Sequence, residues 1–128
     1  MNLFFYSITN SVQSSRVLLE LQRKITNCSI REMPAGTGFI APLSLALRSG
    51  DVVILHVLNI RELQFLMGLK DDFECFRKII CLEDSDPDNV LLSFCRQFSP
   101  RHIAYGNNAV QETVAVVEKM FAGSSKIN

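Results

Sequence analysis

The sequence predicts an α/β fold, a three-layer α/β/α sandwich around a five-stranded parallel sheet of order 2-1-3-4-5. Short apolar runs, rich in aromatic or β-branched residues, alternate along the chain with segments of helical periodicity. Three of these runs lack the alternation of a half-exposed strand, whereas two are more mixed, as edge strands are. Three apolar strands between two more polar edges are typical of this strand order.

The three apolar runs are residues 3–6, 52–56 and 78–82, and we expect them to form the buried central strands. The mixed runs, residues 28–32 and 102–105, are expected at the edges of the sheet. Because neighbouring strands run parallel, each connection between them must cross over the sheet, and such crossovers are right-handed. The segments between the strands should therefore supply helices on both faces.

Each of these segments carries helical signals. In the first helix, Leu18, Leu21 and Ile25 share one face. In the second, Pro42 suits the first helical position and Gly50 is a stop signal. We therefore expect helices to follow the first and the second strand.

The remaining three helices have recognisable starts. Asn59, followed by Glu62 three residues later, resembles a capping box at the start of the third helix. Asp86 and Pro87 open the fourth helix, and Asn108 opens the fifth. The apolar residues of the fifth helix recur at spacings of three and four, at Val110, Val114, Val117 and Phe121.

Length and composition indicate a single globular domain. The chain has 128 residues, of which 48% are hydrophobic and 20% are charged. We expect one domain over residues 1–121 and a flexible tail over residues 122–128, where small and polar residues replace the apolar pattern.

The charge pattern argues against nucleic acid and membrane as partners. Thirteen basic and thirteen acidic residues give a formal net charge of zero, and the basic residues form no cluster. The first residues lack the basic region and long apolar core of a signal peptide, and no apolar run is long enough to span a bilayer. We therefore expect a cytoplasmic protein.

The four cysteines do not have the spacing of a metal site. No two of them stand at C-x-x-C distance, and only two histidines are available as further soft ligands. A disulfide framework is equally unexpected in such a chain. We expect neither a bound metal nor a cofactor, and cysteines that pack as small apolar side chains.

The most specific motif is the third predicted strand, Asp51-Val-Val-Ile-Leu-His56-Val57. It resembles the third strand of the receiver domains of two-component response regulators, D-[LV]-[IV]-L-[LM]-D-[VI], in which the second aspartate accepts a phosphoryl group. Here His56 holds that position. Tyr105 is similar to the aromatic switch residue of the family's fifth strand, and Asn108 stands where the family has a lysine. The resemblance covers nearly the whole chain and implies a flavodoxin-like, receiver-like fold.

The other positions of the receiver pocket also differ from the family. Receivers hold magnesium with an acidic pair after the first strand, where this chain has Tyr6-Ser-Ile-Thr-Asn10, and Leu82 or Glu83 replaces the family's Ser or Thr after the fourth strand. Magnesium sites generally include carboxylates, and an aspartyl phosphate needs a carboxylate nucleophile. The resemblance therefore implies a degenerate form, a pseudo-receiver. Its expected pocket residues are Ser7, Thr9, Asn10, His56, Leu82, Glu83 and Asn108.

His56 and the loop after the first strand each leave an alternative open. An imidazole is nucleophilic and titrates near neutral pH, so His56 could be phosphorylated or sense protons; we favour a hydrogen-bonded histidine in place of the lost acid. Ser7, Thr9, Asn10 and Ser11 also resemble the phosphate loop of flavodoxins, S/T-x-T-G-N-T, but lack its glycine. For this loop we favour a cluster that caps the next helix.

Taken together, these features predict a non-enzymatic, phosphorylation-independent protein-interaction domain in signal transduction or regulation. The resemblance implies a protein partner, including a second copy in a homodimer, bound through the fourth helix, fifth strand and fifth helix. If aromatic rings emerge together on that face, they are the candidate interface: Phe94, Phe98 and Tyr105. The alternative is a small-ligand, flavin-binding or nucleotide-phosphate-binding flavodoxin-like module that uses Ser7, Thr9, Asn10 and Ser11.

Overall fold

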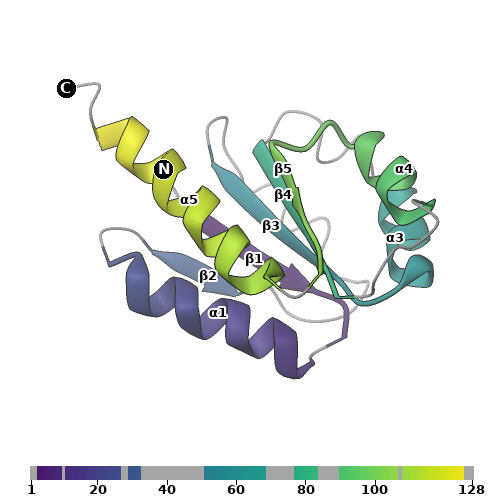
Figure 1. Cartoon of the computed structure of the whole chain (residues 1–128), viewed down its shortest axis with the longest axis horizontal. Coiled ribbons are helices and arrows are strands. Elements are labelled where there is room, and N and C mark those ends of the chain that lie inside the picture. Colours follow the sequence, from purple (N-terminus) through teal and green to yellow (C-terminus); the bar gives the residue numbers. More distant parts are fainter. Residues whose placement is uncertain are drawn as a thin grey trace.

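A computed structural model of the chain describes residues 3–9, 11–26, 29–32, 51–68, 77–83, 90–106 and 108–125. Five parallel strands form one sheet in the order β2-β1-β3-β4-β5 (Figure 1). This order confirms the predicted topology. The strands are β1 (Leu3–Ser7), β2 (Ile30–Glu32), β3 (Val52–Val57), β4 (Arg77–Leu82) and β5 (His102–Ala104).

The burial of the strands follows their predicted places in the sheet. Every residue of β1 and β3 is buried, and in β4 only Arg77 is partly exposed. The edge strands β2 and β5 consist of three residues each and are more exposed. The continuous apolar runs thus indicate strands covered on both faces, as is usual in a parallel sheet.

Helices cover both faces of the sheet. In Figure 1, α1 and α5 lie side by side on one face, and α3 and α4 lie on the other. The sheet and its two helical layers form the predicted three-layer sandwich. The helices are α1 (Val12–Lys24), α3 (Ile60–Met67), α4 (Val90–Arg96) and α5 (Ala109–Ser125). In the described part of the chain, no helix is both long and apolar enough to cross a membrane.

Two predictions about helices fall outside the described residues, and the end of the last helix differs from its prediction. The expected helix between Pro42 and Gly50 lies outside the described residues, as does the expected helix start at Asp86 and Pro87. The last helix, α5, continues to Ser125 and so extends into the stretch 122–128 that was expected to form a tail.

Alternate residues of the central strands pack into two separate hydrophobic cores, one on each face of the sheet. Ile54 packs with α1 and α5, whereas its neighbour Leu55 packs with α3 and α4. In β1, Phe5 faces the first of these cores and Phe4 faces the second. Because side chains alternate along a strand, a continuous apolar run supplies both layers at once.

Side chains cap the first turns of α1 and α3. Ser11 Oγ accepts from the N–H of Ser14, and Ser14 Oγ accepts from the N–H of Ser11, which completes a capping box. Asn59 Oδ1 accepts from the N–H of Glu62 at 3.2 Å, as predicted. Glu62 Oε1, however, accepts from the N–H of Leu58 at 2.8 Å. Both helix starts are thus fixed by residues directly after a strand and its short loop.

Candidate functional site

The carboxyl ends of β1, β3 and β4 bring the candidate residues together. The parallel register pairs Ser7 with His56, and His56 with Cys81. His56 is only 1% exposed and Ser7 only 4% exposed. In open α/β sheets, functional sites lie at this edge, where the strand order reverses between β1 and β3.

The imidazole of His56 contacts three side chains. Its Nε2 lies 2.9 Å from Gln13 Oε1 on α1 and 3.6 Å from Glu83 Oε2, just after β4. Its Nδ1 lies 3.4 Å from Ser7 Oγ, a long contact. Because the amide oxygen of Gln13 can only accept, the short contact assigns the imidazole proton to Nε2.

The hydroxyls near His56 are already bonded within the protein. Ser7 Oγ donates to the carbonyl of Thr9 at 2.7 Å. Ser11 Oγ donates to Glu83 Oε2 at 2.7 Å while it caps α1. We call Ser7, Ser11, Gln13, His56 and Glu83 the His56 network. It joins the ends of β1, β3 and β4 to the first turn of α1, so it acts as a partly buried polar cross-link.

Burial controls the charge of His56. It lowers the pKa of His56 from 6.5 to about 4, and the negative charge of Glu62 opposes this shift without overcoming it. The imidazole is therefore neutral at pH 7. Burial, with the charge of Glu62, also raises the pKa of Tyr6 from 10.0 to about 12, so the phenol keeps its proton. Apart from its carboxylates, the site is thus uncharged at neutral pH.

Ser7, His56 and Glu83 have the residue types of a nucleophile, a base and an orienting acid. Three observations argue against that use in this conformation. The hydroxyl proton of Ser7 is directed to the Thr9 carbonyl, both Ser7 and His56 are closed off from solvent, and a pKa of about 4 makes the imidazole a weak base near neutral pH. In this conformation the three side chains make hydrogen bonds and close contacts within the protein.

The structure separates the two candidates after the fourth strand. Leu82 pairs with Val57 in the sheet and lies in the core beneath α3 and α4. Glu83 is the residue that reaches His56. The N–H of Glu83 donates to the carbonyl of Val57 at 2.9 Å, which holds the residue at the end of the sheet. The acid therefore follows β4 directly.

The other expected pocket residues contribute less. Thr9 is exposed and takes part through its backbone carbonyl, and Asn10 lies outside the described residues. Asn108 is exposed at the start of α5, where its carbonyl accepts from the N–H of Glu112. No hydrogen bond joins Asn108 to the His56 network within the residues that the structure describes. The network is therefore smaller than the expected pocket.

The three candidate interface rings differ in exposure. Tyr105 is 46% exposed, Phe94 is partly buried against the core, and Phe98 is buried within it. Phe98 completes the core beneath α4, so its ring does not emerge on the outer surface of that helix. Of the three rings, Tyr105 alone has the exposure of a contact residue.

Two residues that act on His56 were missed by the sequence reasoning. Gln13 supplies the closest contact to the imidazole of His56, and Glu62 is a buried acid that affects the pKa of both His56 and Tyr6. Glu62 had a visible signal, the capping pattern with Asn59, but that pattern predicts a local bond only. The sequence gives no signal for Gln13 other than its place in the first helical turn after the Ser11 cap.

We expect Ser11→Ala to lower the free energy of unfolding by about 2 kcal/mol, because it removes a helix cap and a hydrogen bond to a carboxylate. Asn59→Ala is the matched control, since it removes a cap alone and should cost about 1 kcal/mol. Urea denaturation of both variants measures the difference. Equal losses would show that the bond between Ser11 and Glu83 adds nothing to stability.

The strand order and the helices on both faces define a flavodoxin-like α/β fold. No protein-family model matches the sequence, and no curated protein matches it. Among the residues described, no three His, Cys, Asp or Glu side chains gather as a metal site. The His56 network and the surfaces around it are therefore the features of this chain that bear on function.

Proposed function

We propose that this chain is a phosphorylation-independent, receiver-like protein-interaction domain in signal transduction or regulation. It is non-enzymatic, works in the cytoplasm and needs no cofactor. The observation that carries the proposal is the His56 network. Receivers have a reactive aspartate at the end of the third strand. At the corresponding position this chain has His56, a neutral, buried histidine that contacts Gln13, Ser7 and Glu83.

The chemistry of this network supports loss of the phosphate switch. Phosphoryl transfer needs a nucleophile that the donor can reach, together with groups that neutralise the phosphoryl oxygens. His56 is closed off, and the one carboxylate in the network, Glu83, is engaged by the Ser11 hydroxyl. Magnesium prefers octahedral oxygen ligands with carboxylates among them, and the loop after β1 supplies no acid. The scaffold and its surfaces remain for binding a partner.

The alternative function is a flavin- or phosphate-binding module. The hydroxyl-rich loop adds no support for it. Ser7 and Ser11 both donate within the protein, so neither proton is free for a phosphate oxygen. Bound phosphate at a helix N-terminus depends on free donors. A colourless protein that gains no thermal stability from flavin mononucleotide or nucleotides agrees with the proposal.

We expect magnesium with beryllofluoride, or with acetyl phosphate, to leave the ¹H–¹⁵N spectrum of the protein unchanged. The reason is that the pocket holds no carboxylate nucleophile at position 56. Magnesium chloride alone is the reference for salt effects, and His56→Ala controls for binding at the imidazole. A saturable shift around His56 that disappears in His56→Ala would contradict the proposal.

A further inference from the structure

Two apolar side chains are exposed on the outer side of α1. Val12 is 80% exposed and Leu19 is 64% exposed, the two highest values among the large hydrophobic residues that the structure describes. They stand one heptad apart, so two helical turns bring them to the same side of the helix. Apolar residues of a helix usually face the core, as Val17 and Leu21 do here. The core of this chain therefore does not account for Val12 and Leu19.

Arginines alternate with this apolar pair along α1. Arg16 lies four residues after Val12 and three before Leu19, and Arg23 follows Leu19 by four. These are the spacings at which side chains lie on one face of a helix. Both arginines are exposed. We call Val12, Arg16, Leu19 and Arg23 the α1 face.

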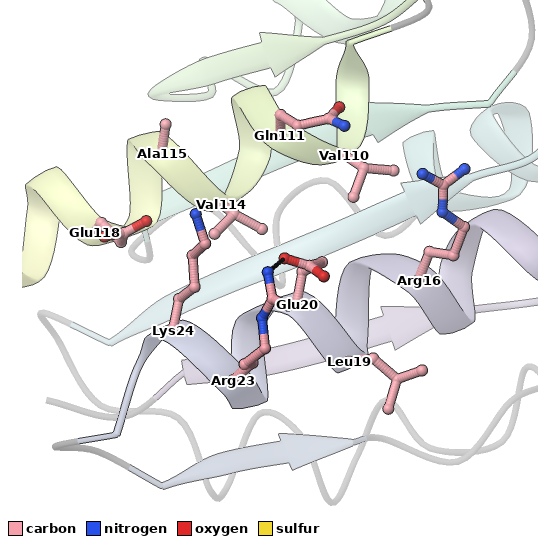
Figure 2. A pocket seen from close by; sticks show the side chains of 10 residues that line it. All are labelled: Arg16, Leu19, Glu20, Arg23, Lys24, Val110, Gln111, Val114, Ala115 and Glu118. Atoms are coloured by element: carbon pink, nitrogen blue, oxygen red, sulfur yellow. Dashed lines mark hydrogen bonds and ion pairs between the residues drawn. The ribbon is translucent and has the colours of Figure 1, made fainter.

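The charge of the α1 face is positive. The one acid of α1, Glu20, is half-buried, and Arg23 neutralises its carboxylate at 2.8 Å (Figure 2). Arg16 and Lys24 form no ion pair within the residues that the structure describes. A groove of about 380 Å³ between α1 and α5 adds Glu118, which Figure 2 shows at the opposite end from Arg16. The α1 face itself thus holds two arginines and no acid.

We propose that the α1 face binds an acidic amphipathic helix of another protein. The inference rests on the proposed protein-interaction function and adds the surface and the chemistry of the partner. The partner helix places apolar side chains against Val12 and Leu19 and carboxylates against Arg16 and Arg23. A single helical face on which apolar and acidic residues recur at spacings of three and four meets both requirements. Exposed apolar residues with charges around them resemble the centre and rim of a small protein interface.

Charge complementarity selects this partner over a second copy of the chain. Two copies of the α1 face would bring arginines against arginines, with no acid of that face between them. Nucleic acid does not fit either, because its phosphates would leave Val12 and Leu19 without an apolar contact. The His56 network holds the first turn of α1 through Ser11 and Gln13, so binding does not have to order this part of the face.

The test titrates ¹⁵N-labelled protein with a synthetic helical peptide at low salt. The peptide is alanine-based and about twenty residues long, with leucines one heptad apart and a glutamate one turn from each leucine. We expect saturable shifts of the α1 amide signals and a dissociation constant that rises with added salt. A matched peptide with glutamine in place of glutamate should bind about ten-fold more weakly, and a lysine peptide should not bind.

Two substitutions separate the charge of the α1 face from its apolar surface. Arg16→Glu reverses a charge, and Leu19→Gln removes apolar surface but keeps a good helix former. Each should raise the dissociation constant for the glutamate peptide about ten-fold. Arg96→Glu and Val90→Gln are the matched controls, because both residues are exposed on α4, on the opposite face of the sheet. Neither control should change the dissociation constant.

Binding that does not saturate, that is equal for the glutamate and lysine peptides, or that ignores both α1 substitutions overturns the proposal. A different occupant overturns it as well. In that case the protein alone sediments as a dimer that Leu19→Gln dissociates, or phosphatidylserine vesicles retain the wild type but not this variant. The outcome is separate from the beryllofluoride test: an inert pocket without peptide binding overturns this inference alone, and a reactive pocket with peptide binding overturns the phosphorylation-independent function alone.

Discussion

We expect the free energy of unfolding to fall by about 3 kcal/mol as the pH falls from 6.5 to 4, owing to His56 alone. Burial gives the folded protein a His56 pKa of about 4, whereas the unfolded chain has the ordinary value of 6.5. Between these values the unfolded chain binds the proton and the folded protein does not. Protonation therefore stabilises the unfolded state, and stability is fully present above pH 6.5.

The measurement is urea denaturation at several pH values between 7 and 4, for the wild type and for His56→Gln. Glutamine keeps a polar side chain beside Gln13 but does not titrate, so the difference between the two curves isolates His56 from the carboxylates and from His102. An NMR titration of the His56 ring protons gives the pKa directly and does not depend on the variant folding. Parallel curves, or a ring that titrates near 6.5, would contradict the expectation.

This pH response distinguishes a structural histidine from a sensor at physiological pH. A histidine that switches between pH 6 and 7 must keep its pKa near 6.5, which requires solvent or a carboxylate that offsets the loss of hydration. Glu83 lies 3.6 Å from Nε2 but is held by the Ser11 hydroxyl, and burial dominates. His56 therefore contributes to the packing of the domain and does not switch near neutral pH. This role agrees with the proposed scaffold, which would bind partners through its surface.

The fold could be predicted because its signals are local. The buried strands β1, β3 and β4 are continuous apolar runs, and the caps at Ser11 and Asn59 precede their helices directly. Such patterns are set by neighbours in the sequence. The end of α5 was harder to place, because glycine and serine have low helix propensity and yet the helix continues through them to Ser125.

The site could be predicted only in part because its contacts join distant segments. His56 and Ser7 are placed by the ends of their strands, which the sequence marks clearly. Gln13 and Glu83 are placed by the register between strands and by the way α1 packs on the sheet. No local pattern fixes either of these, so the choice between Leu82 and Glu83 stayed open until the pairing of β4 with β3 was known.

Ile54→Ala should lower the free energy of unfolding by about 3 to 4 kcal/mol, the second large effect we expect. Ile54 is 0% exposed in the central strand β3 and packs between α1 and α5. Removing most of its side chain loses apolar burial and leaves a cavity that β1 and β4, paired on either side, keep from closing. Val12→Ala is the control, because Val12 is exposed at the start of α1 and its truncation should change stability by less than about 0.5 kcal/mol.

Equilibrium urea denaturation, with the midpoint and the slope fitted separately, gives both values. A loss below about 1 kcal/mol for Ile54→Ala would mean that the layer formed by α1 and α5 packs loosely on the sheet.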